Sequence, residues 1–200
     1  MMQLDTNRAL KEWAVAVEAL EHAQTIVLLR KGGIHEQNGR FQIADDQLLL
    51  YPTYEHQQPS LLKPEYANAV TPVASGWHPE TLRIGSWAAI TEILPLSDVK
   101  AIQALLPFHI WNEKFISDRL KWKPRQPLYV LLLRTYKLAQ AHLIPYNAQY
   151  GGCKSWIDIQ QTISLENSQP VLSDLAYSQL VNEIRQVLNL SLQSPIELPL

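Results

Sequence analysis

The sequence predicts an α+β domain with a mixed or mostly antiparallel curled sheet and helices at the N-terminus, in the middle and at the C-terminus. Apolar runs such as "TIVLL" and "YVLLL" are typical of strands. These strands do not alternate with long helices, as they would in a parallel βαβ arrangement. Closure of the sheet into a small barrel is the alternative. With 200 residues, we expect one globular domain over residues 1–190 and a loose tail over residues 191–200.

The first elements are expected to be a helix and a strand. Apolar residues recur every three or four positions between Asn7 and His22, which predicts an amphipathic helix. A β-branched apolar run over Thr25 to Leu29 predicts a strand. Gly32 and Gly33 should end it, because glycine allows turn conformations that other residues avoid.

A hairpin and a long connection are expected next. The runs Phe41 to Ala44 and Leu48 to Tyr51 flank an Asp-Asp-Gln turn, and Pro52 should end the second strand because it lacks an amide donor. The segment Gln58 to Pro79 contains four prolines and predicts a connection with one short helical turn.

The second half predicts several strands and three helices. Leu82 to Leu94 should form a long strand or two, with a bulge at Gly85. Ser97 and Asp98 are suited to cap the following helix, and Trp111 to Trp122 predicts another. The remaining expectations are a strong strand in "LYVLLLRTYKL", a strand or turn near Ala141 to Pro145, and a last helix that Ser173 caps.

Composition excludes several function classes. A single cysteine rules out an internal disulfide and a multi-cysteine zinc site. No two histidines have the i, i+4 spacing that places two ligands on one helix face. We therefore expect no metal and no cofactor. Neither the Walker phosphate-loop motif nor the dinucleotide-binding glycine motif occurs. No apolar run approaches a membrane span, and the N-terminus has no signal-peptide pattern, which together predict a cytoplasmic protein without membrane contact.

Charge is unevenly distributed. The chain has a net charge of −2, yet the segment from Glu113 to Lys137 has seven basic and two acidic residues. Such a segment predicts an anion-facing surface, to which Lys121, Lys123 and Arg125 would contribute. The alternative is a solvated helix end followed by a charged loop.

A first candidate block follows the strand at Thr25 to Leu29. Exposed backbone amides beside cations form anion sites, which is the chemistry expected of this block. The alternative is an ordinary glycine turn with exposed charges. The block consists of Arg30, Lys31, Gly32, Gly33 and His35.

The stretch "YPTYEHQ" is a second candidate block. Tyr51 and Tyr54 offer faces for stacking, Gln57 offers a hydrogen-bonding edge, and Glu55 with His56 is a weak candidate for an acid–base pair. The alternative is a hairpin exit whose polar side chains cap the following backbone.

The stretch "GGCKSW" is a third. Lys154 adds a cation for an anion site and stands next to Cys153, whose thiol it would activate unless the cysteine is simply a small buried residue. If the blocks that begin at Arg30, Tyr51 and Gly151 converge in space, they form a site; if they lie on different faces, they are turn chemistry.

Five stretches together resemble one protein family: "KEWAVAVEAL", "IVLLRKGGI", "LLLYPTYEHQ", "PLYVLLLRTYKL" and "YGGCKSWIDI". They are similar to the Domain of Unknown Function 1802 family, which is well represented in cyanobacteria. The resemblance covers roughly Leu10 to Ile159 and implies no activity. It implies a restriction setting, because the family accompanies an Mrr-like restriction endonuclease domain in some chains, although this chain has no such domain. "TIVLLRK" and "GSWAAITEIL" resemble, more weakly, PUA-like domains of the ASCH and EVE type, which bind RNA or read modified bases.

Three hypotheses follow. The first is a nucleic-acid-binding module linked to restriction or RNA metabolism, with the reading of modified bases as its narrower version. In this module the cations contact phosphates, and Tyr51, Tyr54 or Trp122 stacks on a base. The second is an enzyme acting on a phosphorylated or nucleotide-like small molecule. The third is a non-catalytic scaffold. A deep pocket that holds the Arg30 and Tyr51 blocks together favours the enzyme, and an open basic groove favours the module.

Overall fold

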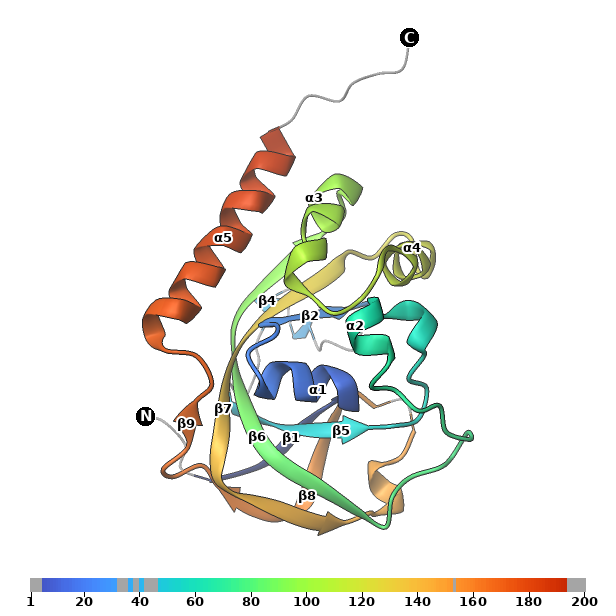
Figure 1. Cartoon of the computed structure of the whole chain (residues 1–200), viewed down its shortest axis with the longest axis vertical. Helices are drawn as coiled ribbons and strands as arrows, with labels where there is room; N and C mark the ends of the chain where they lie inside the picture. The colour runs from blue at the N-terminus through green and yellow to red at the C-terminus, as the bar shows by residue number, and fades with distance from the viewer. Residues whose placement is uncertain (1–4, 32–35, 38–39, 42–46, 153, 194–200) are drawn as a thin grey trace.

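A computed structural model describes residues 5–31, 36–37, 40–41, 47–152 and 154–193, which form an α+β fold (Figure 1). The main sheet has seven strands, in the order β2-β7-β6-β5-β1-β8, with β9 beside β7. Their bounds are β1 Asp5–Trp13, β2 Val27–Arg30, β5 Gln47–Thr53, β6 Thr81–Leu96, β7 Leu128–Pro145, β8 Trp156–Ser164 and β9 Gln169–Pro170. Two further short strands pair with each other, β3 Glu36–Gln37 and β4 Arg40–Phe41.

The sheet is mixed but mostly antiparallel, which confirms the predicted fold class. Strands β1 and β5 run parallel, and the other neighbours in the main sheet run antiparallel. The long strands β6 and β7 curve strongly, so that the sheet wraps around α1 (Figure 1). Within the described residues, β2 and β8 stand at the two ends of the strand order and do not pair, so the curled sheet is not closed into a barrel.

The predicted N-terminal helix is wrong over its first half. Residues Asp5–Trp13 form β1, and only Ala14–Glu21 form a helix, α1. Strand β1 lies between β5 and β8, and Ala9 and Leu10 are both fully buried. A strand with both faces buried loses the strict alternation that identifies an exposed strand, so its apolar spacing is also compatible with a helix.

The predicted hairpin before Pro52 falls partly outside the described residues, which omit 42–46. Its second run is present as β5, whose neighbours in the sheet are β1 and β6. The strand does not end at Pro52 but runs to Thr53. Strand β5 pairs with β6 only from Gln47 to Leu49. Pro52 lies beyond this pairing, so its missing backbone amide costs no hydrogen bond to β6.

Most other elements agree with the predictions, but strands β8 and β9 were not expected. The bulge in β6 lies at Gly85, and the two expected strand segments after Pro127 are one continuous strand, β7. Asp98 caps α3 (Val99–Ala104), and Ser173 accepts a hydrogen bond from the Ala176 amide in the first turn of α5 (Asp174–Gln193). The Gln58–Pro79 connection contains a 3-10 turn at Pro59–Leu61 and the short helix α2 (Pro64–Ala67). The helix expected over Trp111 to Trp122 is α4 (Glu113–Lys121), capped by Asn112.

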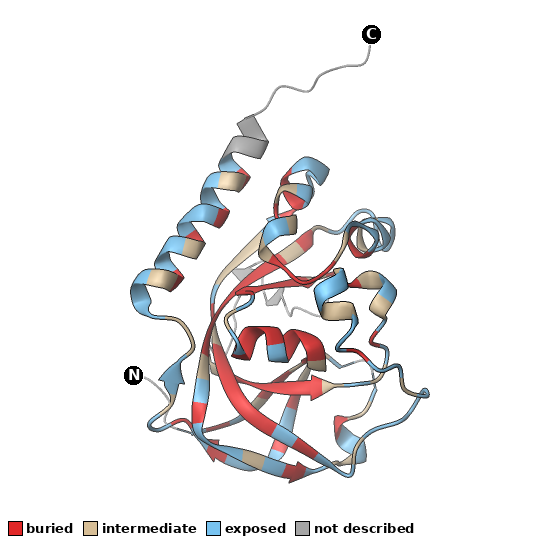
Figure 2. Ribbon diagram, viewed as in Figure 1, coloured by how far each residue is buried: buried red, intermediate tan, exposed pale blue. Residues whose placement is uncertain are grey.

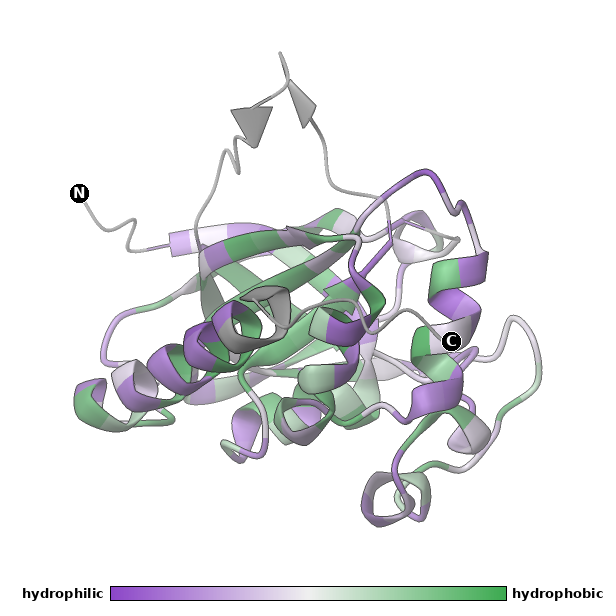
Figure 3. Ribbon diagram, turned by 90° about the horizontal axis from the view of Figure 1, so that it is seen from above, coloured by the Kyte–Doolittle hydropathy of each residue, from purple (hydrophilic) through white to green (hydrophobic). Residues whose placement is uncertain are grey.

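The core has two parts, separated by the sheet. Helix α1 lies inside the curl and is almost entirely buried (Figure 2), and each of its fully buried Val or Leu side chains stabilises the fold by about 1.5–3 kcal/mol. The second part forms around Trp87, Ile84 and Ile159 from β6 and β8. Apolar residues concentrate in the central strands, whereas α5 shows alternating apolar and polar segments (Figure 3). Among the described residues, no helix combines the length and apolarity needed to cross a membrane.

Candidate ligand-binding pocket

Strand direction brings the candidate blocks together. Because β1 and β5 are parallel neighbours, their C-terminal ends lie at the same edge of the sheet, with Lys11 opposite Tyr51 and Trp13 opposite Thr53. Strand β8 runs antiparallel to β1, so the segment that leads into β8 reaches this same edge. The Lys11 amide donates to the Ser155 carbonyl at 2.8 Å.

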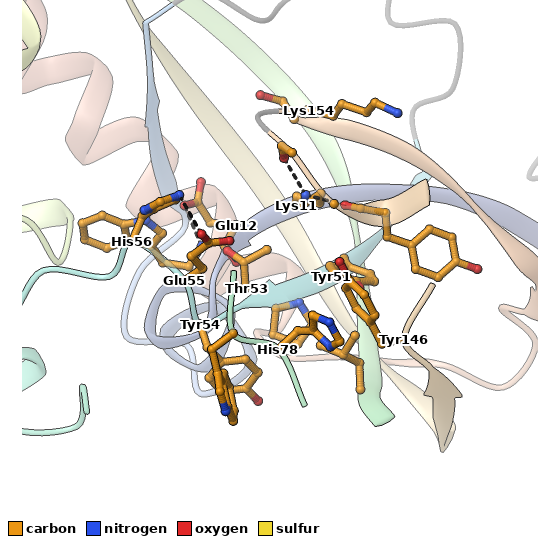
Figure 4. A pocket seen from close by; sticks show the side chains of 18 of the residues that line it. Lys11, Glu12, Tyr51, Thr53, Tyr54, Glu55, His56, His78, Tyr146 and Lys154 are labelled. Atoms are coloured by element: carbon orange, nitrogen blue, oxygen red, sulfur yellow. Dashed lines mark hydrogen bonds and ion pairs between the residues drawn. The ribbon is translucent and has the colours of Figure 1, made fainter. Parts of the chain in front are cut away.

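A pocket of about 580 Å³ lies at this edge. Its walls include residues of all three blocks, so the segments that begin at Arg30, Tyr51 and Gly151 meet in space (Figure 4). Further walls come from the end of β1, the Ser75–Pro79 loop and α4. We call this cavity the aromatic pocket, because its lining includes Trp13, Tyr51, Tyr54, Trp77, Tyr146 and Tyr150.

Arg30 spans the opening between the two ends of the sheet. Its guanidinium forms an ion pair with Glu12 at 2.8 Å and donates to the Lys11 carbonyl at 2.6 Å and the Ser155 hydroxyl at 3.3 Å. The side chains of Arg30 and Glu12 are only 16% and 9% exposed. Arg30 thus links β2 to β1 and to the start of β8, and most of its donors are engaged within the protein.

Aromatic side chains shape the aromatic pocket. Tyr51 is 2% exposed and contacts Tyr150 edge to face at 5.9 Å between ring centroids. Burial raises the pKa of the Tyr51 hydroxyl, with smaller contributions from Tyr146 and Tyr150, so the hydroxyl keeps its proton at neutral pH. Among the described residues, this buried hydroxyl has no hydrogen-bond partner.

The rim of the aromatic pocket has two aromatic pairs. Tyr54 and Trp77 form an edge-to-face pair at 5.9 Å, and their side chains are 36% and 45% exposed. His78 stacks on Tyr146 with centroids 3.3 Å apart. Flat faces at an opening of this kind suit a planar ring entering from solvent.

Glu55 and His56 lie together at the rim, but their geometry favours a structural role. The Glu55 carboxylate accepts hydrogen bonds from the Gly76 amide at 2.7 Å and the Ser75 hydroxyl at 3.1 Å, and His56 Nε2 lies 3.3 Å away. The Gly76 hydrogen bond is the main cause that lowers the Glu55 pKa. A general acid or base at neutral pH needs a carboxyl pKa raised toward 7, so Glu55 is better suited to anchoring the Ser75–Pro79 loop.

A second cavity of about 300 Å³ adjoins the first and shares five lining residues with it: Glu12, Trp13, Arg30, Arg119 and Ser155. Lys31, which is 5% exposed, lines this cavity together with Trp122 and Lys123. We call it the basic pocket, because four cations and one carboxylate line it.

The remaining predicted site residues lie in different places. Gln57 is buried outside both pockets, and its side-chain oxygen accepts from the Val15 amide at the start of α1. Lys154 lines the rim of the aromatic pocket and donates to the Gln149 carbonyl at 3.4 Å. Lys121 and Arg125 are exposed and line neither pocket. Gly32, Gly33, His35 and Cys153 lie outside the described residues.

Several pocket residues were not among the sequence candidates. The Lys11 ammonium donates to the carbonyls of Tyr150 at 2.5 Å and Gly152 at 2.9 Å and thereby holds the glycine loop against β1. Gly152 has φ +77°, a conformation that favours glycine. The sequence predicts a helix over Lys11, Glu12 and Trp13. It therefore gave no sign that these residues lie at the sheet edge that forms the aromatic pocket. Arg119 lay in the basic segment, but its pocket position depends on how α4 packs.

The family model described as "Domain of unknown function (DUF1802)" matches residues 9–183. The chain belongs to the DUF1802 family. This confirms the principal resemblance found in the sequence. No curated protein matches the DUF1802 chain. Within the part of the chain that the structure describes, no group of three His, Cys, Asp or Glu side chains is arranged to hold a metal ion.

Two solved structures are similar to the DUF1802 chain. One is the ASCH protein from Zymomonas mobilis, with 12% identity, a TM-score of 0.40, and coverage of 88% of this chain and 93% of that one. The other is a point mutant of the same protein, with 11% identity, a TM-score of 0.37, and coverage of 88% and 94%. ASCH is one of the two domain types that the weaker sequence resemblance named.

Proposed function

We propose that this DUF1802 protein is a nucleic-acid-binding module that takes one unpaired base into the aromatic pocket. The observation that carries the proposal is the Tyr51 hydroxyl, a buried donor without a described partner on the wall of an aromatic cavity. A buried polar group that lacks a partner lowers stability, so a ligand that accepts its hydrogen bond would relieve that cost.

Size and shape support a base as the ligand. A cavity of about 580 Å³ is within the range of about 300–1,000 Å³ that small-molecule sites occupy. Aromatic faces at the rim would stack on a base of any sequence, and ring nitrogens and carbonyl oxygens of a base are acceptors for Tyr51. A base inside a duplex is unavailable, so single strands should bind better than duplexes.

Loss of the rim aromatics should weaken binding. For Tyr54→Ala or Trp77→Ala we expect affinity for a short single strand to fall about tenfold, because stacking contributes about 1–3 kcal/mol per base. Fluorescence anisotropy with labelled DNA and RNA, with and without modified bases and across a salt series, measures this effect. Tyr66→Ala, which lines neither pocket, is the control. Equal affinity for single strands and duplexes, unaffected by the rim variants, would contradict the proposal.

Removal of the Tyr51 hydroxyl separates binding from folding. For Tyr51→Phe we expect about fivefold weaker binding, because a neutral hydrogen bond contributes about 0.5–1.5 kcal/mol. The free energy of unfolding should be unchanged or higher, because the variant loses a buried hydroxyl that has no described partner. Urea unfolding and the anisotropy titration give the two values. Unchanged binding would leave the scaffold hypothesis as the better account.

A second candidate is an enzyme that acts on a nucleotide-like small molecule. The observation in its favour is that the aromatic pocket holds both the Arg30 and the Tyr51 blocks. The lowered pKa of Glu55, whose carboxylate is held by the Gly76 amide and the Ser75 hydroxyl, counts against Glu55 itself as the general acid or base. Incubation with nucleotides, followed by mass spectrometry of products, tests it. The restriction or RNA-metabolism setting and an Mrr-like endonuclease partner stay predictions of the family resemblance.

A further inference from the structure

The basic pocket has an excess of positive charge. Arg30, Lys31, Arg119 and Lys123 face it together with one carboxylate, that of Glu12. Glu12 is paired with Arg30 at 2.8 Å. Among the described residues, no carboxylate lies within ion-pair distance of the other three cations, although Glu12 influences Arg119 from further away.

Lys31 is the unusual member of this group. It is 5% exposed, and no described residue accepts a hydrogen bond from its ammonium. Burial lowers the pKa of Lys31, and it also lowers the pKa of Arg119. Lysine is rarely so buried without a partner, because the loss of hydration destabilises the charged form. An unpaired cation whose stem is buried and which lines a cavity therefore indicates that an anion belongs there.

The other residues of the basic pocket suit a phosphate group. The Arg119 guanidinium packs over Phe115 and Trp122, at 4.9 and 5.9 Å from their ring centroids, which leaves its N–H donors without a carboxylate partner. Lys123 lies over Trp122 at 4.5 Å. An arginine fork and two ammonium groups provide the charge-assisted donors that phosphate oxygens accept.

We propose that the basic pocket is a phosphate subsite, and that it binds the phosphate of the nucleotide whose base occupies the aromatic pocket. This inference rests on the proposed function, and it names the ligand more closely: a nucleotide and not a nucleoside. The five residues that line both cavities place the subsite directly beside the base pocket. Arg30 and Glu12 form the wall between them, and Lys31, Arg119 and Lys123 contact the phosphate.

The experiment measures how much a phosphate adds to affinity. Nucleosides, nucleoside 5′-monophosphates, short single-stranded oligonucleotides and inorganic phosphate are titrated into the full chain, with tryptophan fluorescence as the signal, because Trp13, Trp111 and Trp122 line the basic pocket. The variant is Lys31→Met, which keeps side-chain length without charge. The matched control is Lys121→Met, an exposed lysine of the same basic segment that lines neither pocket.

We expect the monophosphate to bind about tenfold more tightly than its nucleoside in the natural chain and in Lys121→Met, and this gain to disappear in Lys31→Met. The melting temperature of Lys31→Met should equal or exceed that of the natural chain, because an unpaired cation that lies among other cations is removed. If Lys31→Met keeps the gain, or if phosphate adds nothing in the natural chain, the subsite is overturned.

The same titrations separate this inference from the proposed function. Oligonucleotide and nucleoside binding without a phosphate gain would support the base pocket alone. Binding of inorganic phosphate that Lys31→Met abolishes, without binding of any nucleoside or oligonucleotide, would support an anion site and overturn the proposed function. No binding of any of the four probes would overturn both.

Discussion

Replacement of Arg30 by alanine is expected to lower the free energy of unfolding by about 3–5 kcal/mol, because it leaves the buried Glu12 carboxylate without its partner. The Lys11 carbonyl and the Ser155 hydroxyl lose a donor at the same time. Urea unfolding of the purified variant measures the change. A loss of this size also means that Arg30→Ala cannot serve as a clean test of ligand binding, unlike Lys31→Met.

Arg8→Ala is the matched control for Arg30→Ala. Arg8 lies on β1, the strand that also holds Glu12, and it pairs with Asp158 at 3.0 Å, but the side chains of this pair are 35% and 60% exposed. Exposed pairs contribute about 0–1 kcal/mol. The double variant Arg30→Met with Glu12→Gln should recover part of the stability, because it removes both charges. Equal losses for Arg8→Ala and Arg30→Ala would refute the bridging role of Arg30.

The second large effect concerns pH. Burial and, to a smaller extent, the nearby charge of Lys63 lower the pKa of His109 to about 4. The unfolded chain, with a pKa of about 6.5, therefore binds this proton more strongly than the folded chain. Stability contributed by neutral His109 is fully present above about pH 6.5 and is lost as pH falls toward 4. The loss amounts to at most about 3 kcal/mol.

Urea unfolding at several pH values between 4 and 7 tests this prediction. In His109→Gln the decline toward acid pH should be shallower, because the titrating ring is gone, whatever the variant does to stability at pH 7. His22→Gln, a change at an exposed histidine, should keep the natural slope. Carboxyl groups titrate in the same pH range and contribute to the decline in every variant. The test is therefore the difference between the slope of His109→Gln and the slope of the natural chain. Parallel slopes for His109→Gln and the natural chain would show that His109 is not the responsible group.

Much of the fold was predictable because most of its signals are local. The apolar run in β7, the cap at Asp98 and the stripe along α5 each depend on residues close together in the chain. Strand β1 was not predictable in this way, because what makes it a strand is its pairing with β5 and β8. Side chains buried on both faces of a central strand remove the alternation that would have identified it.

The candidate site was predictable only in part. The Arg30, Tyr51 and Gly151 blocks were identifiable from unusual residue types beside strand ends and glycines. Gln57 was chosen on the same grounds but caps α1, since residue type does not reveal direction. Trp77 and Tyr146 enter the pocket from loops whose course depends on the whole sheet. Their contribution follows from the parallel pairing of β1 and β5, which no short sequence window contains.

The pairing of β1 with β8 also has a consequence for how the chain is made. Arg8 and Asp158 face each other across 150 residues, and the loop before β8 forms one wall of the aromatic pocket. The ribosome must therefore synthesise the 150 residues between Arg8 and Asp158 before β1 gains its second neighbour. Contacts of such long range form slowly, and until β8 arrives one edge of β1 is open to pairing with wrong partners. The pocket thus forms late in folding, when β8 joins the sheet.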